Sequence, residues 1–309
     1  MAVSLVTGGA GFIGSHIVQA LLARGDSVRV LDNFSTGKRQ NLAGFEGQIE
    51  VIEADLRDRQ LVIEAVRDVD YIFHQAAFVS VPQSMREPTE CLDVNVQGTA
   101  ILLEAAREAG VRRVVMASSA AVYGDSNALP LDEDVLLRPL SPYAASKRID
   151  EIYAQLFTDA FSLPAVALRY FNVFGPRQRP DSQYAAAVPI FIRRMLDGKP
   201  ITIFGDGGQT RDLIYVEDVA RANLLVAEHP AAPGQVFNIC TGQETKLLDL
   251  ITILKELFPN APEPLFTEPR SGDIYRSVGD PAKAKGLLGF EAQASLSSGL
   301  KATVAWMKS

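Results

Sequence analysis

Cysteine is scarce in this sequence. Its 309 residues include only Cys91 and Cys240, which lie far apart and lack the spacing of metal ligands. Two such residues give no disulfide framework, and scarce cysteine of this kind is typical of proteins in a reducing compartment. We therefore expect a cytoplasmic protein without a bound metal.

Long apolar runs and an excess of positive charge are also missing. No uninterrupted apolar stretch is long enough to span a membrane, and no basic segment precedes the first apolar run at residues 3–6. The formal net charge is −7, which disfavours a nucleic-acid partner but still allows a local basic pocket for phosphates. The C-terminal half holds seven arginines that could build such a pocket: Arg177, Arg179, Arg193, Arg194, Arg211, Arg270 and Arg276.

The first half of the chain does contain a regular alternation of short apolar runs and helical segments. Such runs are typical of parallel strands covered on both faces. The expected buried strands are Ser4–Thr7, Val28–Asp32, Ile49–Ala54, Tyr71–His74, Arg113–Ser118 and Ala165–Tyr170. The expected helices are Gly11–Arg24, Asp58–Arg67, Pro88–Ala109 and Pro142–Ser162. This order predicts an α/β fold with a Rossmann-type doubly wound parallel sheet.

The alternation ends after about Asn172, where prolines begin to separate shorter elements. We expect residues 1–172 to form the sheet domain and residues 173–309 to form mainly a smaller mixed α/β lobe that shapes a substrate pocket. Residues 212–240 are expected to return to the first domain, because Phe237–Cys240 has the character of a further sheet strand.

Three glycines, Gly8, Gly11 and Gly14, follow the first expected strand and open the first expected helix. In this position the first glycine permits a tight turn, the second lets the backbone approach a pyrophosphate, and the third lets the helix pack closely. The N-terminus of the helix also favours an anion. Three glycines alone are a weak signal, but their place between a strand and a helix predicts a dinucleotide site.

Asp32 ends the second expected strand, where a carboxylate can accept hydrogen bonds from the hydroxyls of an adenosine ribose. The carboxylate would repel a 2′-phosphate, so the sequence favours NAD over NADP. Lys38 and Arg39 are the counterargument, since cations there could hold that phosphate, and Asp32 could instead cap a turn with Asn33.

Two later strand ends complete the expected cofactor site. Asp55 and Leu56 follow the third strand and are placed for adenine. The small residues of the segment His74–Ala77 follow the fourth strand and leave room for the cofactor. His74 itself is assigned no catalytic role.

Tyr143 and Lys147 lie four residues apart on an expected helix, and therefore on one face of it. A phenol has a pKa near ~10 and is a poor base at neutral pH. The charge of the lysine, added to that of an oxidised nicotinamide, stabilises the phenolate and lowers its pKa. Ser119 ends a strand and can hydrogen-bond a substrate hydroxyl. Such a pair occurs by chance on many helices, but beside a nucleotide site it predicts an NAD-dependent enzyme.

With these residues the sequence resembles the extended short-chain dehydrogenase/reductase family, and within it the sugar-nucleotide epimerases. The resemblance runs from Val3 to about Leu288, nearly the whole chain. It includes further motifs in the family's order: Asn95–Thr99, Ser118–Gly124, Arg169–Asn172, Gly205–Gly207, Arg211–Asp212 and Arg270–Asp273. It implies that Tyr143 is the base, Lys147 its tuning and ribose-binding partner, and Ser119 the hydrogen-bonding partner.

The resemblance also implies which residues bind the ligands. For NAD they are Gly8, Gly11, Phe12, Ile13, Gly14, Asp32, Asn33, Ser35, Thr36, Gly37, Asp55, Leu56, Gln75, Ala76, Ala77, Asn95, Tyr143, Lys147 and Tyr170. For the sugar nucleotide they are Ser80, Ser119, Tyr143, Asn172, Ala187, Val188, Phe204, Arg211, Arg270, Asp273 and Ser277.

Within that set the resemblance implies separate roles. Asn172 would contact the sugar diphosphate, Phe204 would stack on the nucleobase, and Asp273 would hold the nucleotide's ribose. Arg211 and Arg270 would neutralise the diphosphate, which suits guanidinium groups. Arg211 could instead pair internally with Asp212 or Asp218.

Ala120 and Ala121 narrow the reaction. The family's dehydratases carry Thr-Asp-Glu where this sequence has Ser119–Ala121, and alanines cannot supply the acid and base that eliminate water. Related decarboxylases usually keep a glutamate there. Cys91 and His74 do not match the extra acid/base pair of the epimerase/reductases that make GDP-fucose. A 4-epimerase needs no further acid or base, so we expect an isomerase that inverts C4 of a nucleotide-linked hexose through a transient 4-keto intermediate, and the resemblance implies UDP as the nucleotide.

The resemblance implies UDP-Glc and UDP-Gal as substrates and assigns Ser277 to a gate beside the C2 substituent of the sugar. A small gate would also admit UDP-GlcNAc and UDP-GalNAc, although a slip of one residue would put Arg276 or Val278 there. The alternative enzyme is a UDP-glucuronate 4-epimerase, which would need donors such as Arg86 or Arg177. The alternative of another class is a non-catalytic NAD-binding redox sensor, which the intact catalytic residues disfavour.

The family commonly forms a homodimer through the helix before Gly110 and the helix of Tyr143. Apolar stripes on these segments could serve this purpose, or could face the chain's own sheet: Leu92, Val96, Ile101, Leu102, Ile149, Ile152, Tyr153 and Leu156. A homodimer is expected.

Overall fold

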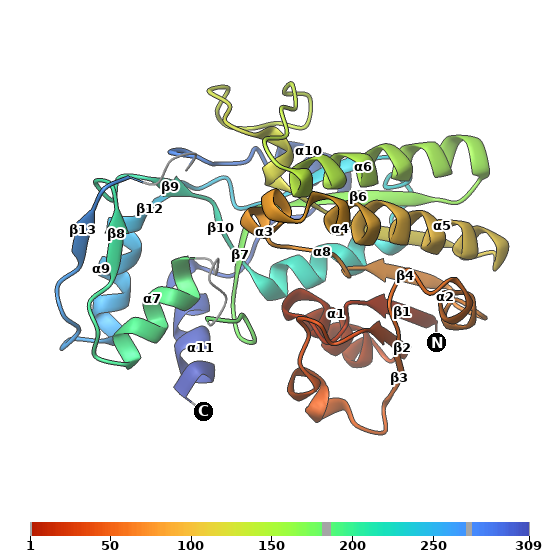
Figure 1. Ribbon diagram of the computed structural model, residues 1–309, viewed down its shortest axis with the longest axis horizontal. Coiled ribbons are helices and arrows are strands. Elements are labelled where there is room, and N and C mark those ends of the chain that lie inside the picture. The colour runs from red at the N-terminus through yellow and green to blue at the C-terminus, as the bar shows by residue number, and fades with distance from the viewer. Residues whose placement is uncertain (1, 181–186, 270–273, 309) are drawn as a thin grey trace.

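The structure is a computed structural model that describes residues 2–180, 187–269 and 274–308. Figure 1 shows two lobes side by side, a larger one that holds the N-terminus and a smaller one that holds the C-terminus. Within the described ranges, every helix is too short or too polar to traverse a bilayer.

A seven-stranded sheet forms the centre of the larger lobe, and all of its strand pairs are parallel. The strands are β1 (Val3–Thr7), β2 (Ser27–Asp32), β3 (Ile49–Glu53), β4 (Tyr71–His74), β5 (Arg113–Ser119), β6 (Ala165–Tyr170) and β11 (Val236–Ile239). Their order is β11-β6-β5-β4-β1-β2-β3, so the direction of winding reverses between β1 and β4. This is the predicted doubly wound Rossmann-type fold, in which ligands bind at the reversal.

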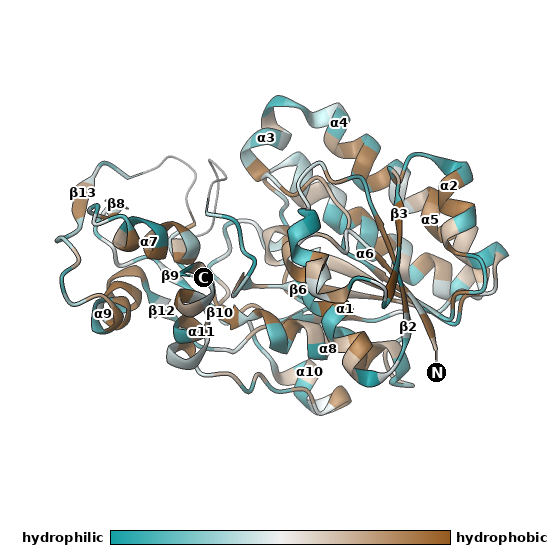
Figure 2. Ribbon diagram, turned by 90° about the horizontal axis from the view of Figure 1, so that it is seen from below, coloured by the Kyte–Doolittle hydropathy of each residue, from teal (hydrophilic) through white to brown (hydrophobic). Residues whose placement is uncertain are grey.

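Helices cover both faces of this sheet, and apolar residues concentrate in the strands between them (Figure 2). One core cluster lies under α1 (Phe12–Arg24), α8 (Val216–Glu228) and α10 (Ala282–Leu288). The opposite cluster lies under α2 (Arg59–Ala65), α5 (Gly98–Glu108) and α6 (Pro142–Phe161). The remaining elements of this lobe are short: η1 (Arg39–Phe45), α3 (Val81–Arg86), α4 (Pro88–Leu92), η2 (Asp93–Gln97) and η3 (Ala120–Tyr123).

Two expectations about these elements are wrong in detail. The strand β3 is not buried: it is the edge of the sheet, and Val51 is 40% exposed. The single helix expected at Pro88–Ala109 is interrupted, because residues 93–97 form a π-helical turn between α4 and α5. Such turns are rare in proteins, and where they occur they often lie at functional sites.

The smaller lobe has its own apolar core, formed by α7 (Ala187–Leu196), α9 (Leu247–Leu257) and α11 (Leu296–Lys308). Its short strands pair two by two: β7 (Asn172–Phe174) with β10 (Leu213–Tyr215), β9 (Thr210–Arg211) with β12 (Thr245–Lys246), and β8 (Thr202–Phe204) with β13 (Leu265–Thr267).

The chain crosses between the lobes several times. After the first part of the smaller lobe, α8 packs against α1 and β11 joins the sheet beside β6. The helix α10 also packs on the larger lobe, since Ala284 and Leu288 belong to the same core cluster as α8. That second return was not predicted, because a seven-residue helix gives little periodic signal.

Candidate active site

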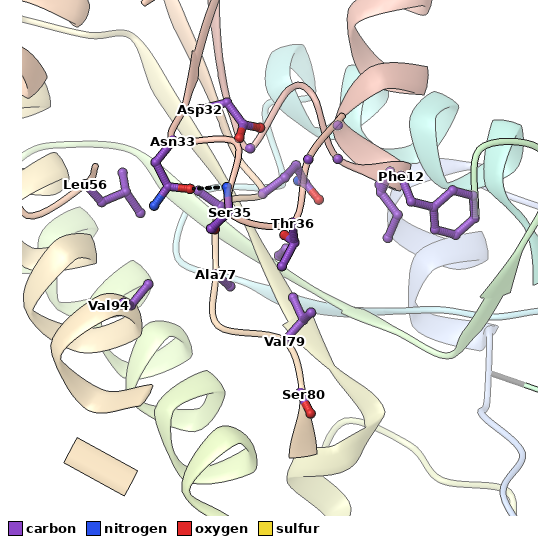
Figure 3. Close-up of a pocket in the computed structure, with 18 of the residues that line it drawn as sticks. Phe12, Asp32, Asn33, Ser35, Thr36, Leu56, Ala77, Val79, Ser80 and Val94 are labelled. Carbon is purple, nitrogen blue, oxygen red and sulfur yellow. Dashed lines mark hydrogen bonds between the residues drawn. The ribbon is translucent and has the colours of Figure 1, made fainter. Parts of the chain in front are cut away.

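A cleft of about 840 Å³ lies at the carboxyl end of the sheet, where the strand order reverses. Its walls come from the loops after β1, β2, β3, β4 and β5, from the start of α6 and from the segment that follows β6. Figure 3 shows Asn33 and Leu56 on one side of this pocket and Phe12 on the other. The sheet therefore places its ligand site where parallel α/β proteins usually have one.

The glycine turn after β1 is shaped so that only glycine fits. Gly8 has φ +67°, and a Cβ on it would lie 2.6 Å from the backbone nitrogen of Ala76. A Cβ on Gly14 would lie 2.2 Å from the carbonyl oxygen of Gly8. Gly11 is the N-cap of α1 and provides no side-chain hydrogen bond. No capping side chain therefore stands between the backbone N–H groups of the first helical turn and the cleft. This cradle fits the pyrophosphate of a dinucleotide.

Asp32 lines the cleft and is almost fully buried. Its Oδ2 accepts a hydrogen bond from the backbone N–H of Ala10 at 2.9 Å, and its Oδ1 accepts one from Phe34 at 2.8 Å. Burial raises the pKa of this carboxyl. Each carboxylate oxygen can accept a further bond, so the turn contacts leave capacity for ribose hydroxyls. Arg39, considered as a phosphate ligand, pairs with Glu53.

The other predicted NAD residues line the same cleft, with one exception. Those present are Phe12, Ile13, Asn33, Ser35, Thr36, Gly37, Asp55, Leu56, Gln75, Ala76, Ala77 and Tyr170. The hydrogen bond from Arg57 lowers the pKa of Asp55 to about 2, so this residue is a carboxylate at neutral pH. The phenol of Tyr170 is held by the side chains of Gln75 and Asn223.

Asn95 is the exception. It is 1% exposed and does not line the cleft. Its amide accepts a hydrogen bond from the backbone of Phe78 and donates to Ser146 Oγ at 2.9 Å. Asn95 ties the loop after β4 to α6, and the π-helical turn carries it there; its contact with the cofactor stays a prediction.

Ser119, Tyr143 and Lys147 all line the cleft, as the sequence predicts. Ser119 is the last residue of β5, and its Oγ accepts a hydrogen bond from the N–H of Ala121. Tyr143 lies in the first turn of α6, which begins sharply because Ser141 caps it and Pro142 follows. The N–H of Tyr143 donates to Ser84 Oγ at 3.2 Å. Strand end and helix start thus bring the three residues into one pocket.

Lys147 has a partner that the sequence did not predict. Its ammonium lies 3.0 Å from Oδ2 of Asp150, and both side chains are buried. Asp150 stands three residues after the lysine on the same helix, and this spacing was a signal that could have identified it.

A second buried pair supports this end of the sheet. Arg169 on β6 binds both carboxylate oxygens of Glu151 on α6, at 2.7 and 3.0 Å. The same guanidinium donates to the Tyr123 hydroxyl at 2.8 Å. Ser118, beside Ser119, donates to Glu151 at 2.7 Å. The strand that carries Ser119 is thereby fixed to the helix that carries Tyr143.

The predicted substrate residues separate into two groups. Ser80 lines the cleft and caps α3. Asn172, Ala187, Phe204, Arg211 and Ser277 lie on the smaller lobe or where the lobes join, and do not line the cleft; Arg270 and Asp273 lie outside the described residues.

Val188 does not present its side chain to a ligand. It is 1% exposed and belongs to the apolar core of the smaller lobe, so its predicted part in substrate binding can come only from its backbone. The two carboxylates considered as partners of Arg211 accept hydrogen bonds elsewhere: Asp212 from Thr241 at 2.7 Å, and Asp218 from Arg221 at 2.6 Å.

Arg177 and Arg179 line the cleft although neither was assigned to the cofactor. Arg177 donates to Gln19 on α1 at 2.7 Å, and Arg179 donates to the carbonyl of Thr36 at 3.1 Å. The segment after β7 therefore reaches across to α1 and to the loop after β2. Its arginines were visible in the sequence, but only the fold shows where they lie.

Comparisons with known proteins agree with this geometry. The model of the NAD dependent epimerase/dehydratase family matches residues 4–240. The chain belongs to the NAD-dependent epimerase/dehydratase family. NAD is accordingly its cofactor, and the glycine cradle, Asp32 and the loops after β3 and β4 form a site that fits it.

Individual relatives in this family align over almost the whole chain. A UDP-glucose 4-epimerase from Mycolicibacterium smegmatis is 42% identical over 99% of this chain and 98% of its own. Among solved structures, a UDP-N-acetylglucosamine 4-epimerase from Methanobrevibacter ruminantium M1 in complex with UDP-N-acetylmuramic acid has a TM-score of 0.95 at 38% identity, and covers 99% and 98% of the two chains. A UDP-glucose 4-epimerase from Thermotoga maritima, solved with UDP-glucose, has a TM-score of 0.94 at 40% identity with the same coverage.

Proposed function

We propose that this protein is an NAD-dependent 4-epimerase of UDP-hexoses, and therefore an isomerase. The observation that carries the proposal is the union of Ser119, Tyr143 and Lys147 with the NAD cradle in one cleft. Ala120 and Ala121 form the short turn directly after Ser119. They supply no second acid or base. Tyr143 and Ser119 are sufficient for oxidation and reduction at C4, but the loss of water would need further acid and base groups.

The roles of the residues follow from their positions. Tyr143 takes the proton of the C4 hydroxyl and returns one to the same oxygen after the 4-keto sugar has turned its opposite face to the cofactor. Ser119 hydrogen-bonds the same oxygen, and the Lys147 charge stabilises the phenolate. Bound in its cradle, NAD supplies the acceptor and donor for the C4 hydride. Because each turnover restores the cofactor, NAD can remain bound through the cycle.

The test is proton NMR of the purified protein incubated separately with UDP-Glc, UDP-GlcNAc and UDP-glucuronate, with and without added NAD. Conversion of UDP-Glc to UDP-Gal supports the proposal, and conversion of UDP-GlcNAc as well extends it to acetylated sugars. Conversion of UDP-glucuronate alone would mean that the protein is a UDP-glucuronate 4-epimerase instead. Loss of every activity at saturating NAD would contradict it and favour the redox sensor.

The choice between plain and acetylated sugars is assigned to Ser277. This residue is half-buried, whereas Arg276 is exposed and paired with Glu244, and Val278 is buried. These surroundings favour Ser277 over its neighbours as the gate. Ser277→Tyr should lower the rate with UDP-GlcNAc relative to UDP-Glc by about 10-fold or more, since a steric change in a pocket is worth ~1–3 kcal/mol. Paired initial rates measure the ratio. Ser277→Ala is the matched control and should keep it, and an unchanged ratio in Ser277→Tyr would remove the gate assignment.

UDP-glucuronate remains the second candidate because Arg86 and Arg177 both line the cleft. Arg177 is directed at Ser15 and Gln19 of α1, toward the cofactor turn. Arg86 ends α3, close to Ser80. Of the two arginines, Arg86 is therefore the one that we expect to bind the C6 carboxylate if the protein acts on UDP-glucuronate.

For the sugar nucleotide we propose that the smaller lobe supplies the remaining contacts, with Phe204 at the base and Arg211 and Arg270 at the diphosphate. We also propose a homodimer through α6 and the helical segment before Gly110, which runs from α4 to α5. Leu92, Ile152 and Leu156 are 40%, 47% and 42% exposed on these helices, as a docking surface requires. Leu102 was included in this stripe but is fully buried in the chain's own core.

A further inference from the structure

The pair formed by Lys147 and Asp150 has no part in the roles described above. The ammonium and the carboxylate lie 3.0 Å apart, with side-chain exposures of 4% and 1%. Lys147 lines the cleft but Asp150 does not. Asp150 therefore stands behind the lysine, where it can act on ligands only through Lys147. Its second oxygen, Oδ1, has no hydrogen-bond partner among the described residues.

The other polar groups around Lys147 do not replace this counter-ion. His74 on β4 is flanked by the hydroxyls of Thr7 at 2.7 Å and Thr99 at 2.9 Å. Burial lowers the pKa of His74 to about 3, so it stays neutral at working pH. Burial likewise raises the pKa of the Cys91 thiol on α4, which stays protonated.

The two remaining charged or titratable neighbours lie on α6 itself. Glu151 uses both of its oxygens on Arg169 and one also on Arg148. Tyr143 is the group whose ionisation Lys147 is meant to support. Asp150 is thus the carboxylate that pairs with the lysine in the described part of the chain.

A fully buried ammonium without a partner does not stay charged. Burial in a medium of low polarity favours the neutral amine and can lower a lysine pKa by about 3–5 units. The positive charge of oxidised nicotinamide in the same cleft adds to that effect. In this protein burial is the largest influence that lowers the pKa of Lys147, and Asp150 is the largest that raises it, with a net shift upward. A neutral lysine could not stabilise the phenolate of Tyr143.

We propose that Asp150 is a positioning residue of this site, which holds the Lys147 ammonium charged and in place so that Lys147 can act on Tyr143. The effect of Asp150 on turnover rests on the proposed epimerase function, whereas its effect on the ionisation of Lys147 does not depend on that function. The pair is complete only while Asp150 is ionised, and burial raises the pKa of that carboxyl to about 6. The assembled charge pair therefore exists above about pH 6 and is lost as the pH falls below it.

The test is the protonation state of Lys147, followed by NMR of the ¹³Cε resonances in lysine-labelled, NAD-loaded protein. The resonance is assigned by its loss in Lys147→Arg. In the wild-type chain Lys147 should stay protonated to at least pH ~10, and in Asp150→Asn it should lose its proton at least ~2 pH units lower. Asp159→Asn is the matched control, because it removes the same charge from an exposed position of the same helix. It should behave as wild type.

Two further readings keep the outcome decisive. In the wild-type chain the Lys147 resonance should shift in a small step on the acid side, as Asp150 takes up its proton, and burial raises the pKa of Asp150 and so the pH of this step; this needs no variant and holds even if Asp150→Asn does not fold. If the protein turns over UDP-Glc, the alkaline limb of the kcat profile should move down with the Lys147 titration in Asp150→Asn. An Asp150→Asn protein whose Lys147 titrates as in wild type, or a wild-type Lys147 that loses its proton well below pH ~10, overturns the proposal. Absence of turnover with the expected titrations overturns only the epimerase assignment.

Discussion

Replacing Tyr143 by phenylalanine should lower kcat for UDP-Glc by about 10²- to 10⁴-fold, the range that a positioned general base contributes. Phenylalanine keeps the ring that lines the cleft and the backbone bond to Ser84, and removes only the oxygen that exchanges the proton. Initial rates by proton NMR, at saturating substrate and with equal NAD content, measure the effect.

Tyr153→Phe is the matched control for that experiment. Tyr153 lies on the same helix, half-buried and packed against Phe157, and it does not line the cleft. Its loss of a hydroxyl should leave kcat within about twofold of wild type. A Tyr143→Phe enzyme that retained the wild-type rate would show that another group is the base.

The second large effect concerns stability. Arg169→Met should lower the free energy of unfolding by about 3–5 kcal/mol, because it strands the carboxylate of Glu151 in the core without its main counter-ion. Arg169 and Glu151 are both buried, and the arginine also holds Tyr123. Urea denaturation followed by circular dichroism measures the loss.

Arg148→Met separates this burial effect from the mere loss of an arginine. Arg148 binds the same Glu151 at 3.0 Å, but its side chain is 41% exposed. Exposed ion pairs contribute about 0–1 kcal/mol, so this variant should remain close to wild type. Equal losses of stability in the two variants would contradict this account, because they would mean that the burial of Arg169 adds nothing to its contribution.

The features that the sequence predicts correctly are those encoded within a few neighbouring residues. Continuous apolar runs placed β1, β2, β4, β5 and β6 to within one residue of their ends. The glycine turn and the Tyr143–Lys147 spacing were identified because each chemistry requires particular residue types at a fixed local separation. The fold then brings them to one cleft because parallel strands share a carboxyl edge.

The misplaced residues depend on contacts between distant segments. The strand β3 reads as apolar but has a neighbour on one side only. The burial of Asn95 likewise depends on Phe78 and Ser146, which belong to two other segments. Asp150 was not singled out from the sequence: its spacing to Lys147 allows a pair on one helix face, but only the fold shows that both side chains are buried. Burial of a polar side chain is a property of the assembled structure, which composition and spacing do not encode.

The late return of α8 and β11 has a consequence for the biosynthesis of this protein. The edge of β6 stays without its neighbour, and the outer face of α1 without its cover, until residue 239 of the 309 has left the ribosome. Asn223, which holds the Tyr170 hydroxyl at 3.0 Å, also arrives with α8. A nascent chain that already contains the glycine turn and Tyr143 therefore cannot complete its cofactor lobe. During translation it presents an open strand edge, the kind of surface that chaperones protect and that otherwise aggregates.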